Sequence, residues 1–361
     1  MTPAALAAAL AALPQRRDFA FSAELGRAAW IDTDVVAWQD DDKPGSVLHT
    51  EPGVALPEGT VVELVDRRHI GLCRPIDAGV ELLAIDVSAP EGPVSKIAAL
   101  ATPRTCLLPR LSGEPWQLLA VTGFEEVTAL LRIEWTHGTW SEVGRLPARI
   151  DGGVWLDRDH KLLLNVLGPN GRAGVHAVDL DAGRFSPFFE VSPDSDDRAV
   201  LFDPATGYLV VTTDAPGWPA VGVVRLGDPG SGVRFLPALP EGDEGARPLA
   251  FVGPPDARRL LLHHEAGLFV RLRTADLDTL EISGPLPVPD GEVGRVVDTD
   301  GSTVRFAFSA PDLPWRPARL DLATGEFRLD LEPAADGDGV PGPAPAPARA
   351  VTFSGPAGPM P

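Results

Sequence analysis

A short phrase of alternating apolar and acidic residues, closed by turn residues, returns along most of the chain. Its six copies occupy 85–94, 133–140, 178–185, 224–235, 275–282 and 320–327, and in one of them arginine replaces the acid. The second residues of these copies are spaced 45 to 51 positions apart. A repeat of about 40–50 residues built from strand-like pieces is typical of a β-propeller. The pattern therefore predicts an all-β ring of repeated sheets.

The segment 152–191 shows what one repeat contains. Its apolar stretches lie at 152–157, 161–168, 174–180 and 184–191, and turn residues separate them. One of these turns contains Asn170-Gly171, a pair suited to the positive φ angles of tight hairpins. Four antiparallel strands joined by hairpins make one propeller blade.

The number of repeats sets the number of blades. Six clear units follow one another, and a shorter, less regular stretch at 28–50 begins a seventh. We therefore predict seven blades of four antiparallel strands, with six blades as the alternative. The ring must also close. Either 19–25 adds a strand to the last blade, or the first and last blades pack directly against each other.

The predicted strands are apolar on both faces. Stretches such as 162–167 and 208–211 are apolar at almost every position, which suits a sheet covered on both sides. Neighbouring blades of a closed ring provide that cover. The acids and glycines of the repeated phrase serve the hairpins, because Asp bonds nearby backbone and Gly tolerates positive φ. The phrase is therefore predicted to be structural.

The two ends of the chain differ from the repeats. Residues 2–14 are rich in Ala and Leu and predict a short helix that ends at Pro14. Because the basic residues Arg16 and Arg17 follow this stretch rather than precede it, we do not expect a signal peptide. Residues 333–348 are rich in Pro, Ala and Gly and predict a semi-extended linker. The expected organisation is a helix and lead-in at 1–18, the propeller at 19–332, the linker at 333–348 and a tail at 349–361.

Composition narrows the classes of partner. The formal charge is −20 and no basic cluster is present, so a nucleic-acid partner is excluded. No stretch is long and apolar enough to span a bilayer, and a cytoplasmic location is expected. Two cysteines, Cys73 and Cys106, form no metal-ligand pattern and are expected to be buried free thiols.

Motifs for bond-breaking chemistry are missing from the sequence. It contains no G-x-S-x-G, no H-E-x-x-H and no phosphate-binding glycine loop. His263 and His264 are adjacent, but neighbouring residues on a strand point to opposite faces and cannot chelate together. The acidic run 194–197 is interpreted as solvated loop charge rather than a calcium site. We expect no catalytic residue, no metal and no cofactor.

One set of candidate contact residues follows from the fold. The loops that join the second strand of each blade to the third gather at one end of a propeller. Two of them, at 215–220 and 311–315, place tryptophan among prolines, and exposed tryptophan favours contact with a protein or ligand. The candidate residues are Glu125, Glu126, Arg172, Trp218, His263, Glu265 and Trp315.

Several of these features together resemble the prolyl oligopeptidase family. They are the four-stranded units, the turn phrase at 320–327 (LDLATGEF), the helix ahead of the ring, and a linker that leads into AVTFSGPAGPMP at 350–361. In that family a seven-bladed propeller precedes an α/β-hydrolase domain that holds the catalytic Ser, Asp and His. No position here matches those catalytic residues. The resemblance implies a non-catalytic propeller that docks with, or gates access to, an α/β-hydrolase domain or subunit.

A second function from another class stays open at this point. Some propellers are enzymes in their own right and use the central pocket for small-molecule chemistry such as lactone hydrolysis or cyclisation. That function requires acids, Asn or His that converge at the mouth of the ring. The ligand expected on either interpretation is a peptide or a small molecule. Fold alone does not choose between them.

Overall fold

The computed structural model describes residues 16–330 apart from 23, 33–34, 41–46, 49–55, 89–93, 103, 112–113, 124–125, 158, 229–231, 240–245, 267–268 and 311–312; it also describes 353–355 and 358–360. The predicted helix at 2–14 and the predicted linker at 333–348 lie outside these residues.

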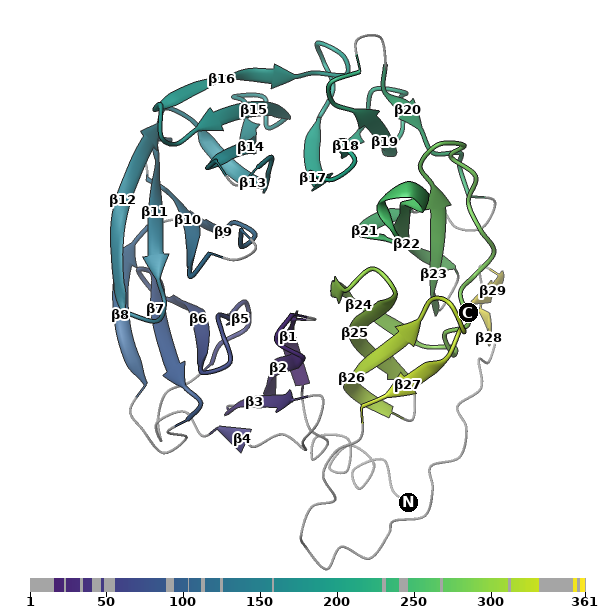
Figure 1. Cartoon of the computed structure of the whole chain (residues 1–361), viewed down its shortest axis with the longest axis horizontal. Coiled ribbons are helices and arrows are strands. Elements are labelled where there is room, and N and C mark those ends of the chain that lie inside the picture. Colours follow the sequence, from purple (N-terminus) through teal and green to yellow (C-terminus); the bar gives the residue numbers. More distant parts are fainter. Residues whose placement is uncertain are drawn as a thin grey trace, which may run out of the picture.

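Seven antiparallel sheets stand around a central axis, and each is one blade of a propeller (Figure 1). Blade 1 comprises β1 (Arg16–Ser22), β2 (Arg27–Asp32), β3 (Val35–Asp40) and β4 (Val47–Leu48). Blade 2 comprises β5 (Val61–Leu64), β6 (His69–Ile76), β7 (Gly79–Asp86) and β8 (Ser95–Ala101). Blade 3 comprises β9 (Arg104–Leu107), β10 (Trp116–Thr122), β11 (Thr128–Glu134) and β12 (Thr139–Leu146). Blade 4 comprises β13 (Arg149–Trp155), β14 (Lys161–Leu167), β15 (Ala173–Asp179) and β16 (Arg184–Phe189).

The remaining three blades complete the ring. Blade 5 comprises β17 (Arg198–Asp203), β18 (Tyr208–Thr213), β19 (Ala220–Arg225) and β20 (Arg234–Phe235). Blade 6 comprises β21 (Arg247–Val252), β22 (Arg259–Ala266) and β23 (Phe269–Asp276), and a single bridge between Ala275 and Ile282 replaces its fourth strand. Blade 7 comprises β24 (Glu292–Thr299), β25 (Thr303–Ala310), β26 (Leu313–Asp321) and β27 (Phe327–Leu329). The seven predicted blades are confirmed and the alternative of six is excluded.

Few other elements accompany the blades. A hairpin of β28 (Phe353–Gly355) and β29 (Gly358–Met360) falls within the predicted tail. Among the residues that the structure describes, the single helical element is the 3₁₀ turn η1 (Pro255–Ala257), and none is a helix able to cross a membrane.

The repeated acids shape the turns between strands. The Oδ1 of Asp321 accepts hydrogen bonds from the backbone N–H groups of Ala323 and Thr324, at 2.9 and 2.8 Å, and Gly325 follows with a φ of +73°. Asp276 accepts equivalent bonds in blade 6. Bonds from backbone N–H groups hold the pKa of both carboxyls below its ordinary value. The phrase is structural, as its residues predict.

Apolar side chains fill the space between successive blades. Between blades 3 and 4 the cluster includes Trp116, Leu118, Leu162 and Leu164, none of them more than 2 % exposed. Burial of each such side chain contributes about 1.5–3 kcal/mol. Comparable clusters lie between every successive pair from blades 1 and 2 to blades 6 and 7. The runs that are apolar on consecutive positions are therefore covered on both faces.

The ring closes by direct packing of its first and last blades. β1, which contains most of the segment 19–25, pairs with β2 inside blade 1. It lies beside β24, β25 and β26 of blade 7 without joining their sheet (Figure 1). The alternative in which 19–25 adds a strand to the last blade is wrong, because this stretch is the innermost strand of the first blade.

Candidate binding sites at the two ends of the ring

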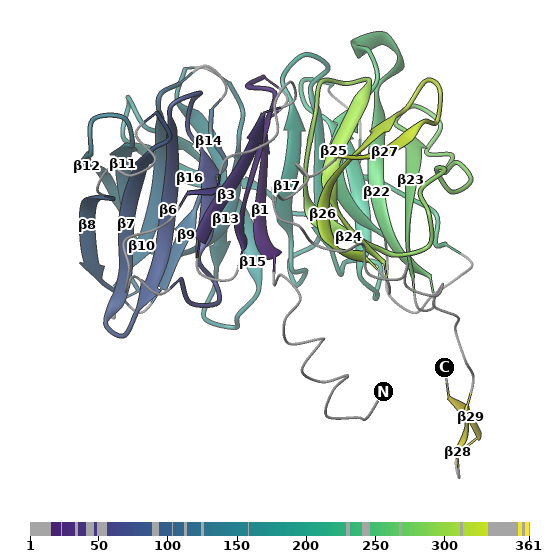
Figure 2. The ribbon, with the colours of Figure 1, turned by 90° about the horizontal axis from the view of Figure 1, so that it is seen from below.

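The strand order gives the ring two distinct ends. We call the strands of a blade A to D from the axis outward. They run along the axis of the ring, which is upright in Figure 2, and each is antiparallel to its neighbours. The loops from B to C and the connections from D to the next A therefore share one end, here called the B–C end. The turns from A to B and from C to D share the other, the A–B end.

Three of the predicted contact residues lie in loops at the B–C end. Glu126 and Arg172 follow β10 and β14, and Trp218 precedes β19. The Oε1 of Glu126 is 3.5 Å from Arg149 Nη1 of blade 4. The Nη1 of Arg172 is 3.8 Å from Asp214 Oδ2 of blade 5. Glu126 and Arg172 thus form ion pairs with residues of the neighbouring blade near the surface.

The other predicted residues are placed differently. His263, Glu265 and Trp315 lie within strands β22 and β26 rather than in loops, and Glu125 falls outside the described residues. Glu265 is partly exposed, and its Oε1 is 3.8 Å from Arg295 Nη2 of blade 7. Trp315 is half-buried. The structure thus brings Glu265, but not His263, to an accessible position.

His263 is a buried side chain and offers nothing to a partner at the surface. It is 3 % exposed, its Nε2 lies 3.3 Å from the carbonyl oxygen of Val293, and burial lowers its pKa. His264, 1 % exposed, follows it on the same strand and points to the opposite face of the sheet. Among the described residues, no group of His, Cys, Asp and Glu is arranged to bind a metal ion.

The acidic run 194–197 contains a structural anchor. Asp197 is 1 % exposed, so its interpretation as solvated loop charge is wrong. Its carboxylate accepts bonds from Thr213 Oγ1 at 2.5 Å, from the Val191 N–H at 2.7 Å and from Ser195 Oγ at 2.8 Å. These bonds compensate for burial of the charge and fix the connection between blades 4 and 5.

A groove opens at the B–C end between blades 5 and 6. We call it the Trp218 groove, and its volume is about 770 Å³. Its apolar lining consists mainly of Trp218, Pro219 and Val221 from blade 5 and Leu236, Pro237 and Leu239 from the connection to blade 6. Arg198 and Arg247 stand among the charged residues that also line it. The indole of Trp218 is 59 % exposed, the largest exposure among the large apolar side chains of the described residues.

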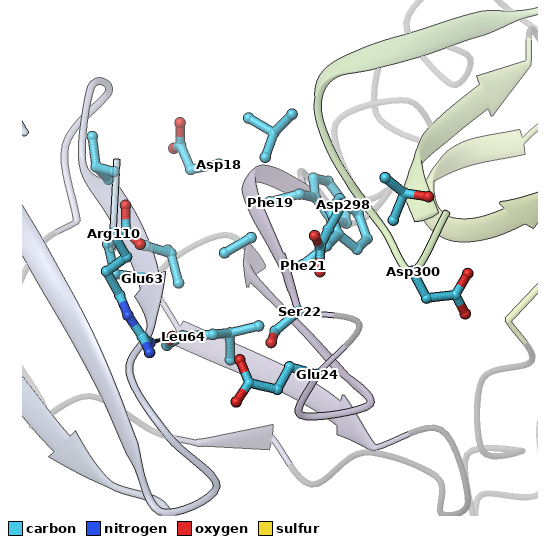
Figure 3. Close-up of a pocket in the computed structure, with 15 residues that line it drawn as sticks. Asp18, Phe19, Phe21, Ser22, Glu24, Glu63, Leu64, Arg110, Asp298 and Asp300 are labelled. Carbon is cyan, nitrogen blue, oxygen red and sulfur yellow. Dashed lines mark hydrogen bonds between the residues drawn. The ribbon is translucent and has the colours of Figure 1, made fainter. Parts of the chain in front are cut away.

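A second pocket, of about 760 Å³, lies in the central channel near the A–B end (Figure 3). Strands β1, β5 and β24 form it, and Arg110 reaches it from blade 3. Phe19 and Phe21 of β1 lie in it with their ring centroids 6.0 Å apart. Five carboxylates gather in its lining: Asp18, Glu24, Glu63, Asp298 and Asp300.

Glu63 is the most perturbed acid of this pocket. Burial raises its pKa to about 7, although a hydrogen bond to Gln117 and the charge of Arg110 act in the opposite direction. A carboxyl with a pKa near neutrality can hold or release a proton under ordinary conditions. Sequence reasoning missed Glu63 because it occupies an ordinary position on a strand.

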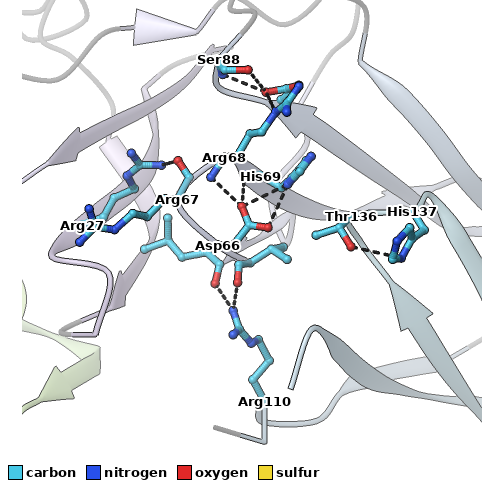
Figure 4. A network of polar contacts seen from close by, with 12 residues as sticks. Arg27, Asp66, Arg67, Arg68, His69, Ser88, Arg110, Thr136 and His137 are labelled. Carbon is cyan, nitrogen blue, oxygen red and sulfur yellow. Dashed lines mark hydrogen bonds and ion pairs between the residues drawn. The ribbon is translucent and has the colours of Figure 1, made fainter. Parts of the chain in front are cut away.

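Arginines from both neighbouring blades donate hydrogen bonds to the backbone around the A–B turn of blade 2 (Figure 4). Arg27 of blade 1 donates through Nη1 to the carbonyl oxygen of Arg67, at 2.7 Å. Arg110 of blade 3 donates through Nη1 to the carbonyl oxygen of Leu64, at 2.5 Å. Each guanidinium satisfies a backbone acceptor of a neighbouring blade, so this network serves ring assembly.

The shape of the chain matches propellers of prolyl oligopeptidase-type enzymes. A puromycin-hydrolyzing peptidase of Mycobacterium tuberculosis superposes with a TM-score of 0.64 and 19% identity, over 96% of this chain and 57% of that one. A prolyl endopeptidase gives 0.61 and 14% identity, over 90% and 51%. The isolated propeller domain of the Trilobed protease from Pyrococcus furiosus, which has an open velcro topology, gives 0.58 and 15%, over 88% and 97%.

These likenesses concern the fold. The chain spans 57% and 51% of the two enzymes but 97% of the isolated propeller domain. A scan against protein families and a search of curated proteins both found no match. The fold implied by the resemblance to the prolyl oligopeptidase family is therefore confirmed.

Proposed function

We propose that this chain is the propeller module of a prolyl oligopeptidase-type hydrolase. Its B–C end covers an α/β-hydrolase domain or subunit and restricts which peptides or small molecules reach the catalytic serine of that partner. The ring itself contributes no reacting group. The fold is that of the propellers in such enzymes, and the sequence lacks a nucleophile elbow.

The observation that carries the proposal is that the first and last strands of the ring have their outer chain ends on the same side. The chain enters β1 at the B–C end, and β27, the last strand of blade 7, runs toward the same end. A domain that continues from blade 7 is therefore tethered to the face that carries Glu126, Arg172 and Trp218. The direction of the chain and the position of the exposed contact residues both favour the B–C end as the docking face.

The charged loops of this face suit a specificity role. Exposed ion pairs such as Arg172 with Asp214 contribute only about 0–1 kcal/mol to stability. Charges at the rim of an interface mainly set orientation and exclude wrong partners. These side chains can accordingly exchange their present partners for those of a docked hydrolase.

The test uses a fluorophosphonate probe, which labels activated serines of hydrolases. The purified chain is expected to stay unlabelled. A labelled serine hydrolase is expected in material that an antibody against the ring recovers from the source cells, either as a partner or as a longer form of the same protein. Labelling of the purified chain, or recovery without any labelled hydrolase, contradicts the proposal.

A matched pair of variants locates the docking face. Reversal of charge at both Glu126 and Arg172 at the B–C end is expected to reduce recovery of the hydrolase. Arg68→Glu at the A–B end, a site that is 63 % exposed, is the control and is expected to leave recovery unchanged. Equal effects of both variants count against the B–C end.

The channel pocket favours the second candidate, a free-standing enzyme for small molecules. Five carboxylates line this pocket, and the pKa of Glu63 is raised to about 7. If this pocket carries out catalysis, the purified chain hydrolyses members of a lactone panel or cyclises their open-chain counterparts, and Glu63→Gln abolishes that turnover. No turnover across the panel, or turnover that survives the substitution, removes this candidate.

A further inference from the structure

The Trp218 groove presents apolar surface that nothing in the ring covers. Trp218 is 59 % exposed, and Pro219, Pro237 and Ala238 beside it are exposed as well. Val221 at its base is only 6 % exposed. A concave apolar site walled by an aromatic ring and prolines is the type of surface that takes extended, proline-rich segments. Its chemistry therefore indicates an uncharged, preformed polyproline-type chain as the ligand.

The chain itself contains a segment of this kind. Residues 340–348 read VPGPAPAPA and carry no charge. Proline at every second position from Pro341 to Pro347 favours the polyproline II conformation, so little conformational entropy is lost when the segment binds. Such a segment contains no Lys or Arg that Arg198 or Arg247 at the groove would repel.

We propose that residues 340–348 bind in the Trp218 groove of the same chain. This inference goes beyond the docking of a hydrolase and does not depend on it.

The tether is long enough for this contact. β27 ends blade 7 and runs toward the B–C end, where the groove opens between blades 5 and 6. Packed sheets lie about 10 Å apart, so the segment must pass roughly two blade spacings, about 20 Å. Ten residues, the number from 331 to 340, reach up to about 30 Å if they are extended at roughly 3.1 Å per residue.

Because the chain after β27 connects the segment to the ring, even a weak affinity for the groove is sufficient to keep the groove occupied. A short flexible connection gives an effective concentration on the order of 1 mM. A free peptide with a Kd of about 0.1 mM would then occupy its groove about ten to one when attached.

The experiment places a bimane fluorophore on the full chain at Ala344→Cys, because tryptophan quenches bimane on contact. Cys73 is buried and Cys106 half-buried, and burial raises the pKa of their thiols to about 12 and about 11, so neutral pH favours labelling of the introduced cysteine. Strong quenching is expected in the parent. Trp218→Phe is expected to restore the emission several-fold.

Controls separate this contact from other sources of quenching. Trp140→Phe removes a tryptophan that is 44 % exposed on the outer strand β12 and is expected to leave the quenching intact. Thermal unfolding of Trp218→Phe checks that the ring is unchanged. Replacement of the four prolines from 341 to 347 by serine is expected to reduce the quenching.

Three results would overturn the proposal. The first is bright emission in the parent, and the second is quenching that Trp218→Phe leaves unchanged. The third is quenching that fades on dilution, or that labelled Trp218→Phe chains acquire when mixed with unlabelled parent, because the groove would then hold a segment from another copy. Recovery of a hydrolase is a separate measurement, so failure here and failure of the proposed function are distinguishable.

Discussion

Six of the seven junctions between blades differ from the seventh, where the ring closes. Each of the six holds an apolar cluster to which both blades contribute, as between blades 3 and 4. At the closing junction the cluster found among the described residues comes from blade 1 alone: Ala28, Trp30 and Ala37, with Phe19 and Phe21 packed against them. Blades 7 and 1 are adjacent in space but share less apolar packing.

Polar groups also differ between the junction of blades 4 and 5 and the closing junction. Between blades 4 and 5 the amide of Asn165 donates to the carbonyl oxygen of Ala199 at 3.0 Å and accepts from its N–H at 2.8 Å. At the closing junction, burial lowers the pKa of Arg316, and the like charge of Arg16 acts in the same direction. Because the apolar cluster at the closing junction comes from blade 1 alone, we expect this junction to be the least stable of the seven, and the channel pocket lies beside it.

Core truncation should give the largest difference between the two kinds of junction. Leu164→Ala, at 0 % exposure between blades 3 and 4, is expected to reduce the free energy of unfolding by about 2–5 kcal/mol. Phe21→Ala at the closing junction is expected to cost less than half of that, because Phe21 is only partly buried. Urea unfolding measures both, with the 42 % exposed Phe188→Ala as a near-neutral control. Equal losses at both junctions would refute the contrast.

The pH dependence of stability tests Glu63, the half-buried acid that blade 2 places against blade 3. The pKa of Glu63 is raised to about 7 in the folded chain, from an ordinary 4.5. Between these values the folded chain keeps a proton that the unfolded chain loses, so the free energy of unfolding falls as pH rises through this window. Glu63→Gln should flatten this part of the profile, measured by urea unfolding from pH 4 to 8. An unchanged slope would show that Glu63 titrates normally.

Loss of a bridging amide should have an intermediate effect. Asn165→Ala leaves two buried backbone groups of Ala199 without partners, so a loss of about 1–3 kcal/mol is expected. Asn170→Ala, in the exposed turn after β14, is the matched control and should change stability far less. Similar losses for both variants would mean that the bridge does not hold blades 4 and 5 together.

The exposed ion pairs at the B–C end should matter least for folding. Arg172→Ala breaks a 3.8 Å pair with Asp214 and is expected to change the free energy of unfolding by less than about 1 kcal/mol. Thermal unfolding in low and high salt checks this value. A larger loss would assign these pairs a structural role and weaken their assignment to partner contact.

The sequence predicted local features better than those set by tertiary contacts. The spacing of the repeated phrase predicted a ring of repeated sheets because turn acids such as Asp321 bond within their own turns. The seventh blade was predicted from the less regular stretch at 28–50. The pairing of β1 was ambiguous, since its apolar residues suit either blade. The burial of Asp197 depends on Thr213 of the next strand pair, and the perturbed pKa of Glu63 depends on packing by blade 3. No local pattern encodes such neighbours.

Candidate site residues were likewise predicted well where local sequence determines exposure and poorly where tertiary contacts do. Trp218 was found because its proline-rich loop signals an exposed aromatic. His263 was misplaced because its side chain is buried against Val293 of blade 7, a contact between blades that no local pattern encodes. The Trp218 groove itself combines residues of blade 5 with the connection to blade 6, so it becomes visible only in the folded ring.

Amide hydrogen exchange of the intact chain tests most directly the claim that one junction is weaker than the other six. The innermost strands β1 and β24, which meet at the closing junction, are expected to exchange at least about tenfold faster than β13 and β17, a difference of about 1.4 kcal/mol in local opening. Equal protection of all seven innermost strands would contradict the account.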